Sequence, residues 1–384
     1  MNRIAKALLK IYSSFIRKTN NYVIFESSND FFDNGFALYQ YVKEHYPQYK
    51  IKYVVTSKKM IQSGQYRGVS KKEMLKASSK LTLYKYSLKA KAIFINYLNY
   101  WKKLKLPEAT RLVFLTHGEF PLKDCTEYYD YMFGDQENKI TICTRTEFTK
   151  KTLLDVYPPM RNHLMEILGM PRNDIMFHPN INKEAVLKSF GLKEYKNQDV
   201  ILSMTTFRNK DVDRNNYFEE EFPINLTNDD LEKLNDLLIK NNQVLVIKLH
   251  PKQENVIKPT NLDNILFITN KNIIQNNTTT GELYTICNSL LTDYSTSYLG
   301  FLNLDRRIGF ILSDKDKYSK DRGWTIPNVE EYMPGEKLYS KEDLFAFFKC
   351  SDSDKYKKDR EHVRELLTGN YKDQNCKLIA EKFL

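Results

Sequence analysis

Two histidines stand directly after predicted β-strands and could take part in acid–base or phosphate chemistry. His117 follows the apolar run RLVFLT and precedes a glycine, and His250 follows VLVIKL and precedes a proline. An imidazole titrates near neutral pH, so His117 suits a general base and His250 a hydrogen-bond donor to a phosphate oxygen. Glu119 could orient or polarise the ring of His117. The alternative for each histidine is a structural role without chemistry.

A hydroxyl-rich segment, TDYSTS at residues 292–297, ends another predicted strand and begins a predicted helix. Helix N-termini present free N–H groups and a partial positive charge, which together favour phosphate binding. Ser295, Thr296 and Ser297 would add hydroxyl donors, with Asp293 in a supporting role. The alternative is an ordinary Ser/Thr helix cap.

Three cations stand at or just after other strand ends. Arg172 belongs to GMPRND, Arg208 to TFRN, and Lys248 lies two residues before His250. A guanidinium fork fits phosphate oxygens, so the two arginines are candidates for phosphate contact, and the cation of Lys248 is a further candidate. For the arginines, salt bridges to the flanking acids are the alternative.

Several common motifs are missing from the sequence. There is no GxGxxG, Walker loop, HExxH or GxSxG, which disfavours nicotinamide, ATP-hydrolysing, zincin and α/β-hydrolase chemistry. Three DxD spacings in an Asp-rich chain look like chance, so we predict no metal site and no cofactor. The five cysteines form no CxxC or zinc pattern, which indicates reduced thiols of a cytosolic protein.

Short apolar runs alternate with helical stretches through the whole chain. This alternation predicts α/β architecture, with mostly parallel sheets covered by helices. The pattern restarts near residue 200, after a seam that carries Pro171 and Pro179, so two consecutive Rossmann-like domains are expected. Ligands bind such sheets beyond the carboxyl ends of the strands, where the candidate residues fall. The predicted divisions are a basic amphipathic helix at 1–20, an N-terminal Rossmann-like domain at 21–175, a C-terminal Rossmann-like domain at 176–338, and C-terminal helices at 339–384.

Positive charge is concentrated in two segments. The chain has 384 residues, a formal net charge of +11 and 41% hydrophobic residues, which exclude a mostly disordered chain. Residues 1–20 hold five basic and no acidic residues, and residues 80–111 hold eight basic and one acidic. An anionic membrane surface is the expected partner of both segments. The alternative for residues 1–20 is a helix packed on its own domain, and the alternative for residues 80–111 is a buried strand flanked by solvated lysines. The candidate residues at the strand ends disfavour a nucleic-acid-binding protein or a non-catalytic membrane-surface protein.

The order of motifs resembles the CDP-glycerol glycerophosphotransferase family, whose members build teichoic acids and related capsular polymers. The resemblance rests on FES followed by DNG-FALYQY, then HG-x-x-PLK, GMPRND, TFR, KLHP and TDYSTS, and it runs from about Tyr22 to Gly323. It implies a GT-B fold, two Rossmann-like domains facing an interdomain cleft, with His117 and His250 as catalytic residues. It also implies that the N-terminal domain (21–175) lies on the acceptor side and that the C-terminal domain (176–338) binds the CDP donor, with donor-phosphate contacts from Ser295, Thr296 and Ser297.

The implied reaction transfers a polyol phosphate from a CDP-activated donor to an acceptor hydroxyl and releases CMP. Glycerol phosphate is the expected polyol phosphate. The acceptor would be a membrane-associated teichoic acid or capsular polysaccharide, and the enzyme would sit peripherally on the cytoplasmic face of the membrane. One departure concerns the family's HGTPLK pattern, since Glu119 and Phe120 stand where one threonine is usual. The alternative enzyme is a GT-B glycosyltransferase that uses a CMP- or UDP-activated sugar.

Overall fold

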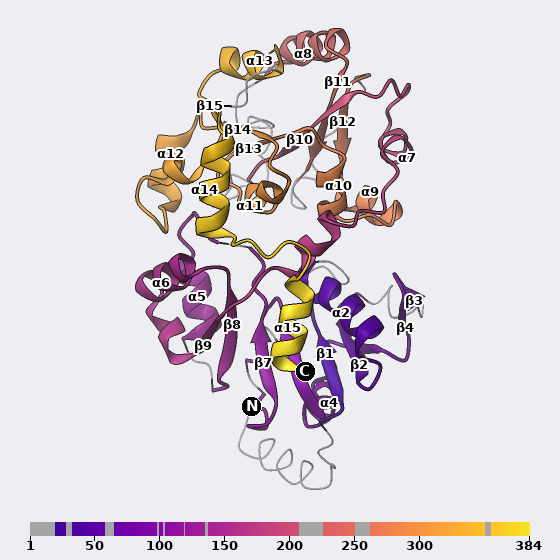
Figure 1. The fold of residues 1–384 in the computed structure, drawn as a ribbon, viewed down its shortest axis with the longest axis vertical. Coiled ribbons are helices and arrows are strands. Elements are labelled where there is room, and N and C mark those ends of the chain that lie inside the picture. The colour runs from indigo at the N-terminus through magenta and orange to yellow at the C-terminus, as the bar shows by residue number, and fades with distance from the viewer. Residues whose placement is uncertain are drawn as a thin grey trace. The chain divides into compact units, whose positions relative to one another are not determined.

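The computed structural model describes residues 20–27, 33–57, 65–97, 100–102, 104–118, 120–134, 137–206, 226–249, 262–349 and 355–384. These residues form two compact units (Figure 1). The first unit comprises Met1–Glu119, Cys125–Asp174 and Gly369–Leu384, and the second comprises Phe120–Asp124 and Ile175–Thr368. The chain therefore passes from one unit to the other four times.

The described part of the first unit is built on a seven-stranded sheet in the order β5-β2-β1-β6-β7-β8-β9. All neighbouring strands pair in parallel. Their inner residues are buried on both faces, as the continuous Val/Ile/Phe runs predict for a sheet covered by helices. The strands are β1 (Tyr22–Phe25), β2 (Lys50–Val55), β5 (Met74–Lys76), β6 (Ala90–Ile95), β7 (Arg111–Phe114), β8 (Ile140–Thr144) and β9 (Leu164–Ile167).

The described part of the second unit holds a six-stranded parallel sheet in the order β12-β11-β10-β13-β14-β15. Numbered within the unit, this is the 3-2-1-4-5-6 order of a doubly wound Rossmann sheet, whose direction of winding reverses between the first and fourth strands. The strands are β10 (Asp199–Met204), β11 (Gln243–Lys248), β12 (Ile265–Ile268), β13 (Ser289–Thr292), β14 (Arg307–Ile311) and β15 (Glu336–Leu338).

Helices alternate with the strands, and several begin at side-chain caps that the sequence makes visible. Thr146 caps α6 (Glu147–Val156) and Thr227 caps α8 (Asn228–Lys240), each in a reciprocal capping box. The other helices in the described part of the first unit are α2 (Asp33–His45), α4 (Lys80–Ser87), α5 (Thr126–Phe133) and α15 (Asn375–Phe383). Those of the second are α7 (Lys183–Ser189), α9 (Asn270–Gln275), α10 (Thr280–Thr285), α11 (Ser297–Phe301), α12 (Lys315–Arg322), α13 (Lys341–Lys349) and α14 (Lys357–Leu367).

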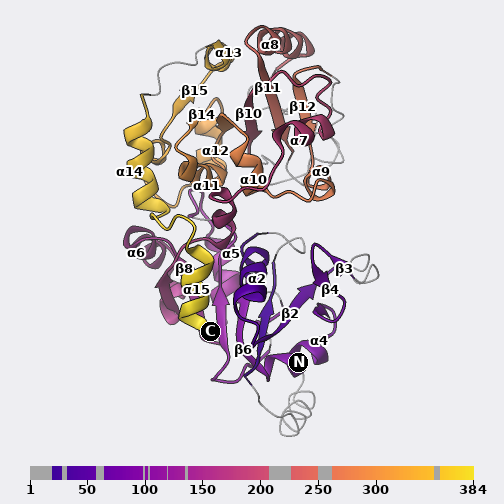
Figure 2. The ribbon, with the colours of Figure 1, turned by 45° about the vertical axis from the view of Figure 1, so that its right-hand side comes forward.

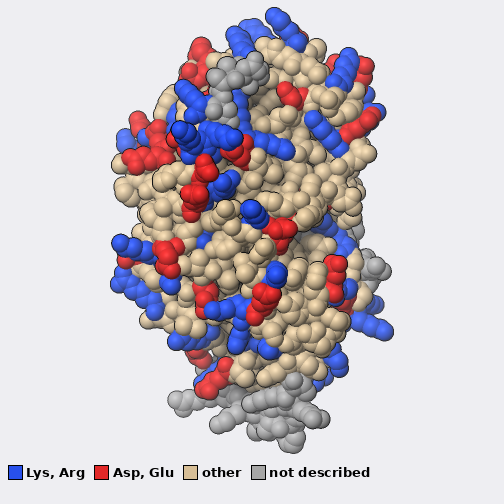
Figure 3. All heavy atoms as spheres, viewed as in Figure 1, with Lys and Arg blue, Asp and Glu red and all other residues tan. Residues whose placement is uncertain are grey.

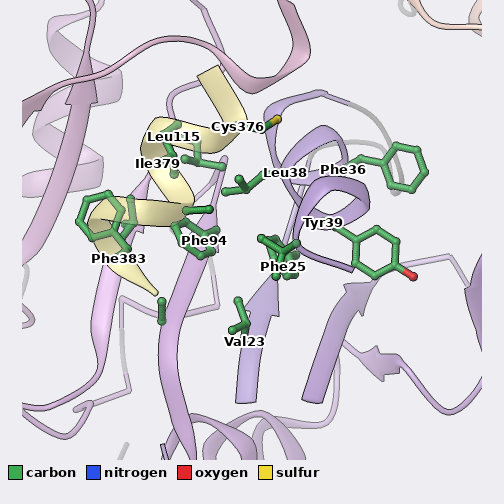
Figure 4. Close-up of a cluster of buried hydrophobic side chains, with 14 of the residues drawn as sticks. Val23, Phe25, Phe36, Leu38, Tyr39, Phe94, Leu115, Cys376, Ile379 and Phe383 are labelled. Carbon is green, nitrogen blue, oxygen red and sulfur yellow. The ribbon is translucent and has the colours of Figure 1, made fainter. Parts of the chain in front are cut away.

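The C-terminal helix belongs to the core of the first unit. Ile379 and Phe383 of α15 are buried in one cluster with Phe94 of β6 and Leu38 of α2 (Figure 4). Figure 2 shows α15 beside α2, over the same sheet. Burying one such side chain contributes roughly 1.5–3 kcal/mol, so the last residues of the chain stabilise the sheet formed by its first residues.

The N-terminus of α15 is fixed by two polar side chains. Asp174 accepts hydrogen bonds from the backbone N–H groups of Asn375 at 3.0 Å and Cys376 at 2.8 Å. Asn375 in turn accepts from Met170 N at 2.7 Å. Gly169 leaves the space for this contact, because a Cβ there would lie 1.7 Å from Asn375 Oδ1.

The two apolar runs that precede the candidate histidines are strands, since β7 lies within RLVFLT and β11 begins one residue before VLVIKL. The sequence analysis did not identify β5, β15 or the short hairpin β3 (Gln65–Tyr66) and β4 (Val69–Ser70). The compact units also divide the chain differently from the predicted ranges. Residues 339–368 pack with the second unit and Gly369–Leu384 with the first, rather than forming a separate C-terminal group.

Candidate active site

The carboxyl edge of the first sheet brings together residues that are distant in sequence. The winding of the sheet reverses between β1 and β6, and α2 begins over this position. Gly35 N donates to Asn96 Oδ1 at 2.9 Å, and a Cβ on Gly35 would lie 2.4 Å from Glu26 O, so only glycine fits. The reversal point of a doubly wound sheet is the usual ligand site.

His117, Asp33 and Arg172 form a connected group at this edge. His117 Nδ1 lies 2.6 Å from Asp33 Oδ2, and Arg172 Nη1 donates to Asp33 Oδ1 at 2.7 Å and to His117 O at 2.9 Å. The Asp33 side chain is 5% exposed, whereas the His117 side chain is 55% exposed. The imidazole is thus held from behind by a buried carboxylate and open to solvent on its other side.

Electrostatics keep the Asp33 carboxyl ionised. Burial alone would raise its pKa, but the charges and hydrogen bonds of Arg172 and His117 outweigh burial and lower the pKa below its usual value. An ionised carboxylate only accepts hydrogen bonds, so the proton in the short contact belongs to Nδ1 of His117. Whenever the ring is neutral, its one proton therefore lies on Nδ1, and Nε2 can accept a proton, as a general base requires.

Aromatic side chains line the same region. The rings of Tyr97 and His117 have centroids 5.5 Å apart, and the indole N–H of buried Trp101 donates to Glu26 Oε2 at 2.8 Å. Within the second basic segment, Tyr97 therefore lies beside His117, whereas Trp101 belongs to the buried interior.

The second unit has its own group at the corresponding point of its sheet, between β10 and β13. Asp293 is completely buried and accepts hydrogen bonds from Thr206 N at 2.9 Å, Thr206 Oγ1 at 3.0 Å and Ser295 N at 2.9 Å. These bonds tie the ends of the two central strands together. Asp293 therefore fixes the turn that carries the predicted phosphate-binding hydroxyls.

The helix after this turn is short. Ser297 begins α11, whose five residues run into a 3₁₀ turn, and Thr296 precedes it without a side-chain capping bond. Ser295 Oγ instead accepts from Ser297 N at 3.4 Å. The structure thus places Ser295, Thr296 and Ser297 together at the carboxyl end of β13.

Lys248 ends β11 at the same edge. Ile247 pairs with Ser203, and Met204 pairs with Thr292, so the ends of β11, β10 and β13 lie in line. Arg208, His250 and Glu119 lie outside the described residues. Of the predicted site residues, the structure therefore describes two separate groups, His117 with Arg172 and Lys248 with Asp293 to Ser297.

The sequence analysis missed Asp33 as a site residue. It noted the DNG sequence as part of the resemblance but assigned the carboxylate beside His117 to Glu119. The signal was present in Asp33-Asn34-Gly35, because an Asp–Asn–Gly sequence at a strand-to-helix turn is a typical place for left-handed backbone, and Asp33 has φ +65°. The neighbouring Asn34 donates to Thr116 O at 3.1 Å, in the loop that bears His117.

Among the described residues, no group of three or more His, Cys, Asp or Glu side chains could hold a metal ion. No helix in the same residues is both long and apolar enough to cross a membrane.

The fold is of the GT-B type, with two Rossmann-like units, and the described residues place an Asp-supported histidine at the carboxyl edge of one sheet and a hydroxyl-rich turn at the carboxyl edge of the other. The chain belongs to the CDP-glycerol:poly(glycerophosphate) glycerophosphotransferase family, whose sequence model matches residues 8–377. The predicted α/β class and the resemblance to this family are confirmed.

Relatives with known names agree with this assignment. The chain is 29% identical over 212 residues to the teichoic acid poly(glycerol phosphate) polymerase of Bacillus spizizenii, covering 55% of this chain and 48% of that protein. It is 25% identical over 375 residues to the polymerase of the same name from Bacillus subtilis, covering 89% and 45%. The chain thus spans about half the length of these relatives. A structure of the wall teichoic acid polymerase TagF soaked with CDPG has the same fold, with a TM-score of 0.75 and 18% identity over 98% of this chain and 92% of that one.

Proposed function

We propose that this protein transfers glycerol phosphate from CDP-glycerol to a hydroxyl group of a membrane-associated teichoic acid or capsular polysaccharide, and releases CMP. Membership of the glycerophosphotransferase family supports the reaction class. The observation that carries the proposal for this chain is the exposed imidazole of His117 on the buried carboxylate of Asp33. CDP-ribitol is the second donor to test.

In the proposed mechanism, His117 Nε2 takes the proton of the acceptor hydroxyl. The hydroxyl oxygen then forms a bond to the β-phosphorus of the donor, and the bond from that phosphorus to the bridging oxygen breaks, so CMP leaves with the electron pair. Asp33 stabilises the imidazolium that results, as a carboxylate does for a catalytic histidine. We expect no metal or organic cofactor, since CDP-glycerol is a substrate.

The donor diphosphate is proposed to bind at the carboxyl edge of the second sheet. The hydroxyls of Ser295, Thr296 and Ser297 and the cation of Lys248 are the described groups that would contact it, with Arg208 and His250 from the rest of the predicted set. Their place beside the reversal of winding supports this role. Stabilising the charge that develops on the phosphates is the main task of such a site.

The proposed partner on the other side is an anionic membrane at the cytoplasmic face. The amino ends of the strands in the first sheet carry cations, namely Lys50, Lys89, Lys91, Arg111 and Lys139. Since the strands are parallel, these residues share one edge, opposite the edge that bears His117. Strands of this length rise roughly 15–20 Å, so a membrane on the basic edge would leave the active site about that far from the lipid.

Figure 3 shows Lys and Arg side chains on both units, interspersed with Asp and Glu on the face drawn. Because both signs of charge are mixed on that face, it is not the surface that we propose to bind an anionic membrane. The basic edge of the first sheet is the proposed membrane-binding surface. A membrane-bound acceptor would reach the site with the end of its chain.

The test is a donor screen. Purified protein is given CDP-glycerol, CDP-ribitol, CMP-sialic acid or a UDP-sugar with a lipid-linked acceptor, and released CMP or UDP is measured. We expect CMP release and acceptor elongation with a CDP-polyol, and loss of both in His117→Ala. Release only from a nucleotide sugar would establish the alternative glycosyltransferase, and no release from any donor would reject the proposal.

A further inference from the structure

A completely buried guanidinium lies directly behind the loop of His117. Arg145 follows β8, is 1% exposed and is therefore out of contact with solvent. Arginine is seldom buried to this degree unless its donors are satisfied inside the protein. Its contacts therefore indicate what it is there to hold.

Arg145 connects the ends of β7 and β9, the two strands that pair with β8 on either side. Its Nη2 donates to Thr116 Oγ1 at 2.6 Å and to Leu115 O at 3.3 Å, both just after β7. Its Nη1 donates to Leu168 O at 2.9 Å and Gly169 O at 3.2 Å, just after β9. One side chain thus fixes the two loops from which His117 and Arg172 extend.

The residue held by Arg145 has an unfavourable backbone conformation. Thr116 has φ +63°, in the left-handed region. A β-branched residue is a genuine outlier there, because its Cβ is crowded by the backbone. Such a conformation persists only when the surrounding structure determines it.

Three side chains supply that constraint on Thr116. Arg145 holds its hydroxyl, while Asn34 and Asn96 both donate to its carbonyl oxygen. Thr116 directly precedes His117, so its left-handed backbone sets the direction in which the next residue leaves the strand end. The ring of His117 thereby meets Asp33, which is itself left-handed with φ +65°.

We propose that Arg145 is a positioning residue, which holds Thr116 in the left-handed conformation and so sets the imidazole of His117 against Asp33. It reaches no substrate, and it acts through the backbone of the loop. The catalytic consequence rests on the proposed function, whereas the geometry of the pair can be measured without it.

Two substitutions at Thr116 separate this role from simple packing. Thr116→Val and Thr116→Gly both remove the hydroxyl that Arg145 holds. Valine keeps the crowded Cβ and loses the bond that offsets it, whereas glycine adopts positive φ without steric cost. A purely structural role of the hydroxyl predicts equal or greater damage from glycine, because glycine also adds chain entropy in the unfolded state.

The first readout is independent of activity. The proton shared by His117 Nδ1 and Asp33 should give a far-downfield proton NMR signal, assigned by its loss in Asp33→Asn and His117→Ala. We expect the signal to persist in Thr116→Gly, and to be lost or broadened in Thr116→Val and in Arg145→Lys. Adding Thr116→Gly to Arg145→Lys should restore it.

The second readout is the rate of CMP release. Misplacing a catalytic group by about 1 Å costs roughly 10²-fold, so Thr116→Val should lower kcat by about that factor with little change in KM, while Thr116→Gly stays near the wild-type rate. A valine variant with wild-type signal and rate, or a glycine variant as impaired as valine, would overturn the proposal. If no variant or wild type releases CMP while the NMR pattern holds, the proposed function fails and the positioning role stands.

Discussion

His117 and Asp33 are 84 residues apart in the chain, yet Nδ1 of the histidine lies 2.6 Å from Oδ2 of the aspartate. One side chain follows β7 and the other begins α2. In the neutral ring their contact places the proton on Nδ1, and Nε2 is the atom proposed to take the proton of the acceptor hydroxyl. The predictions on catalysis start from this pair.

Asp33→Asn should impair chemistry more than binding. Asparagine tolerates the left-handed backbone at this position, so the fold should be retained, but its amide offers no negative charge to the imidazolium. We expect kcat for CMP release to fall by about 10²–10⁴-fold with KM for CDP-glycerol nearly unchanged. Steady-state kinetics check this result, and a kcat within threefold of wild type would remove Asp33 from the mechanism.

The same pair makes stability depend on pH in acid. The pKa of Asp33 is lower in the folded protein than its usual value of about 3.9, so its ionised form stabilises the fold above that pH, and this stabilisation is lost as pH falls through the folded pKa. Urea unfolding of wild type and Asp33→Asn between pH 7 and pH 3 should show the gap between them narrowing below about pH 4. A gap that is constant with pH would mean that the carboxylate is not held ionised.

Asp293 should matter for donor binding. Asp293→Ala would leave the buried donors of Thr206 and Ser295 without their acceptor, at a cost of about 1–3 kcal/mol in folding free energy. Because the released turn carries the Ser295–Ser297 hydroxyls, we expect KM for CDP-glycerol to rise more than kcat falls. Asp293→Asn, which keeps one acceptor oxygen, is the control, and its KM for CDP-glycerol should lie between those of wild type and Asp293→Ala. Equal KM values in all three proteins would contradict the proposed donor site.

Gly169→Ala should loosen the C-terminal helix. The added Cβ would overlap Asn375 Oδ1, so either the loop or α15 must shift. Overpacking of this kind costs typically about 1–3 kcal/mol, measurable as a lower urea midpoint. Faster proteolysis near residue 375 should accompany it. An unchanged urea midpoint would show that the loop or α15 shifts without loss of folding free energy.

The basic edge of the first sheet can be tested by charge reversal. Lys50, Lys85 and Lys139 are exposed at or next to that edge, whereas Lys240, Lys271 and Lys349 are exposed on the second unit. Replacing the first three by glutamate should reduce cosedimentation with phosphatidylglycerol vesicles at least tenfold at low salt, because each cation near an anionic surface contributes about 1 kcal/mol. The second triple variant carries the same charge change and should bind like wild type. Equal losses would indicate an effect of net charge alone, and binding to RNA in place of vesicles would favour a nucleic-acid partner.

The sequence indicated the architecture because parallel strands in helix-covered sheets appear as short, uninterrupted apolar runs. It also located His117, Arg172 and Asp293, since each follows such a run. It could not identify the Asp33 contact, because that depends on β1, β6 and β7 being adjacent in the sheet, and strand order is not visible in a local pattern. The left-handed backbone of Thr116 could not be predicted either, because threonine rarely adopts positive φ and the contacts that hold it there come from distant residues.

The position of α15 has a practical consequence for dividing the protein. A fragment that stops at Asp174 would expose the apolar surface of Phe94 and Leu115 that the last helix covers, and should aggregate. The carboxylate of Asp174 nevertheless touches the first residue of that helix. Splicing residue 174 to residue 369 through a few glycines, with the segment Phe120–Asp124 of the second unit replaced by a polar linker, should therefore yield the first unit as an autonomous protein, in which the histidine–aspartate pair can be studied by itself.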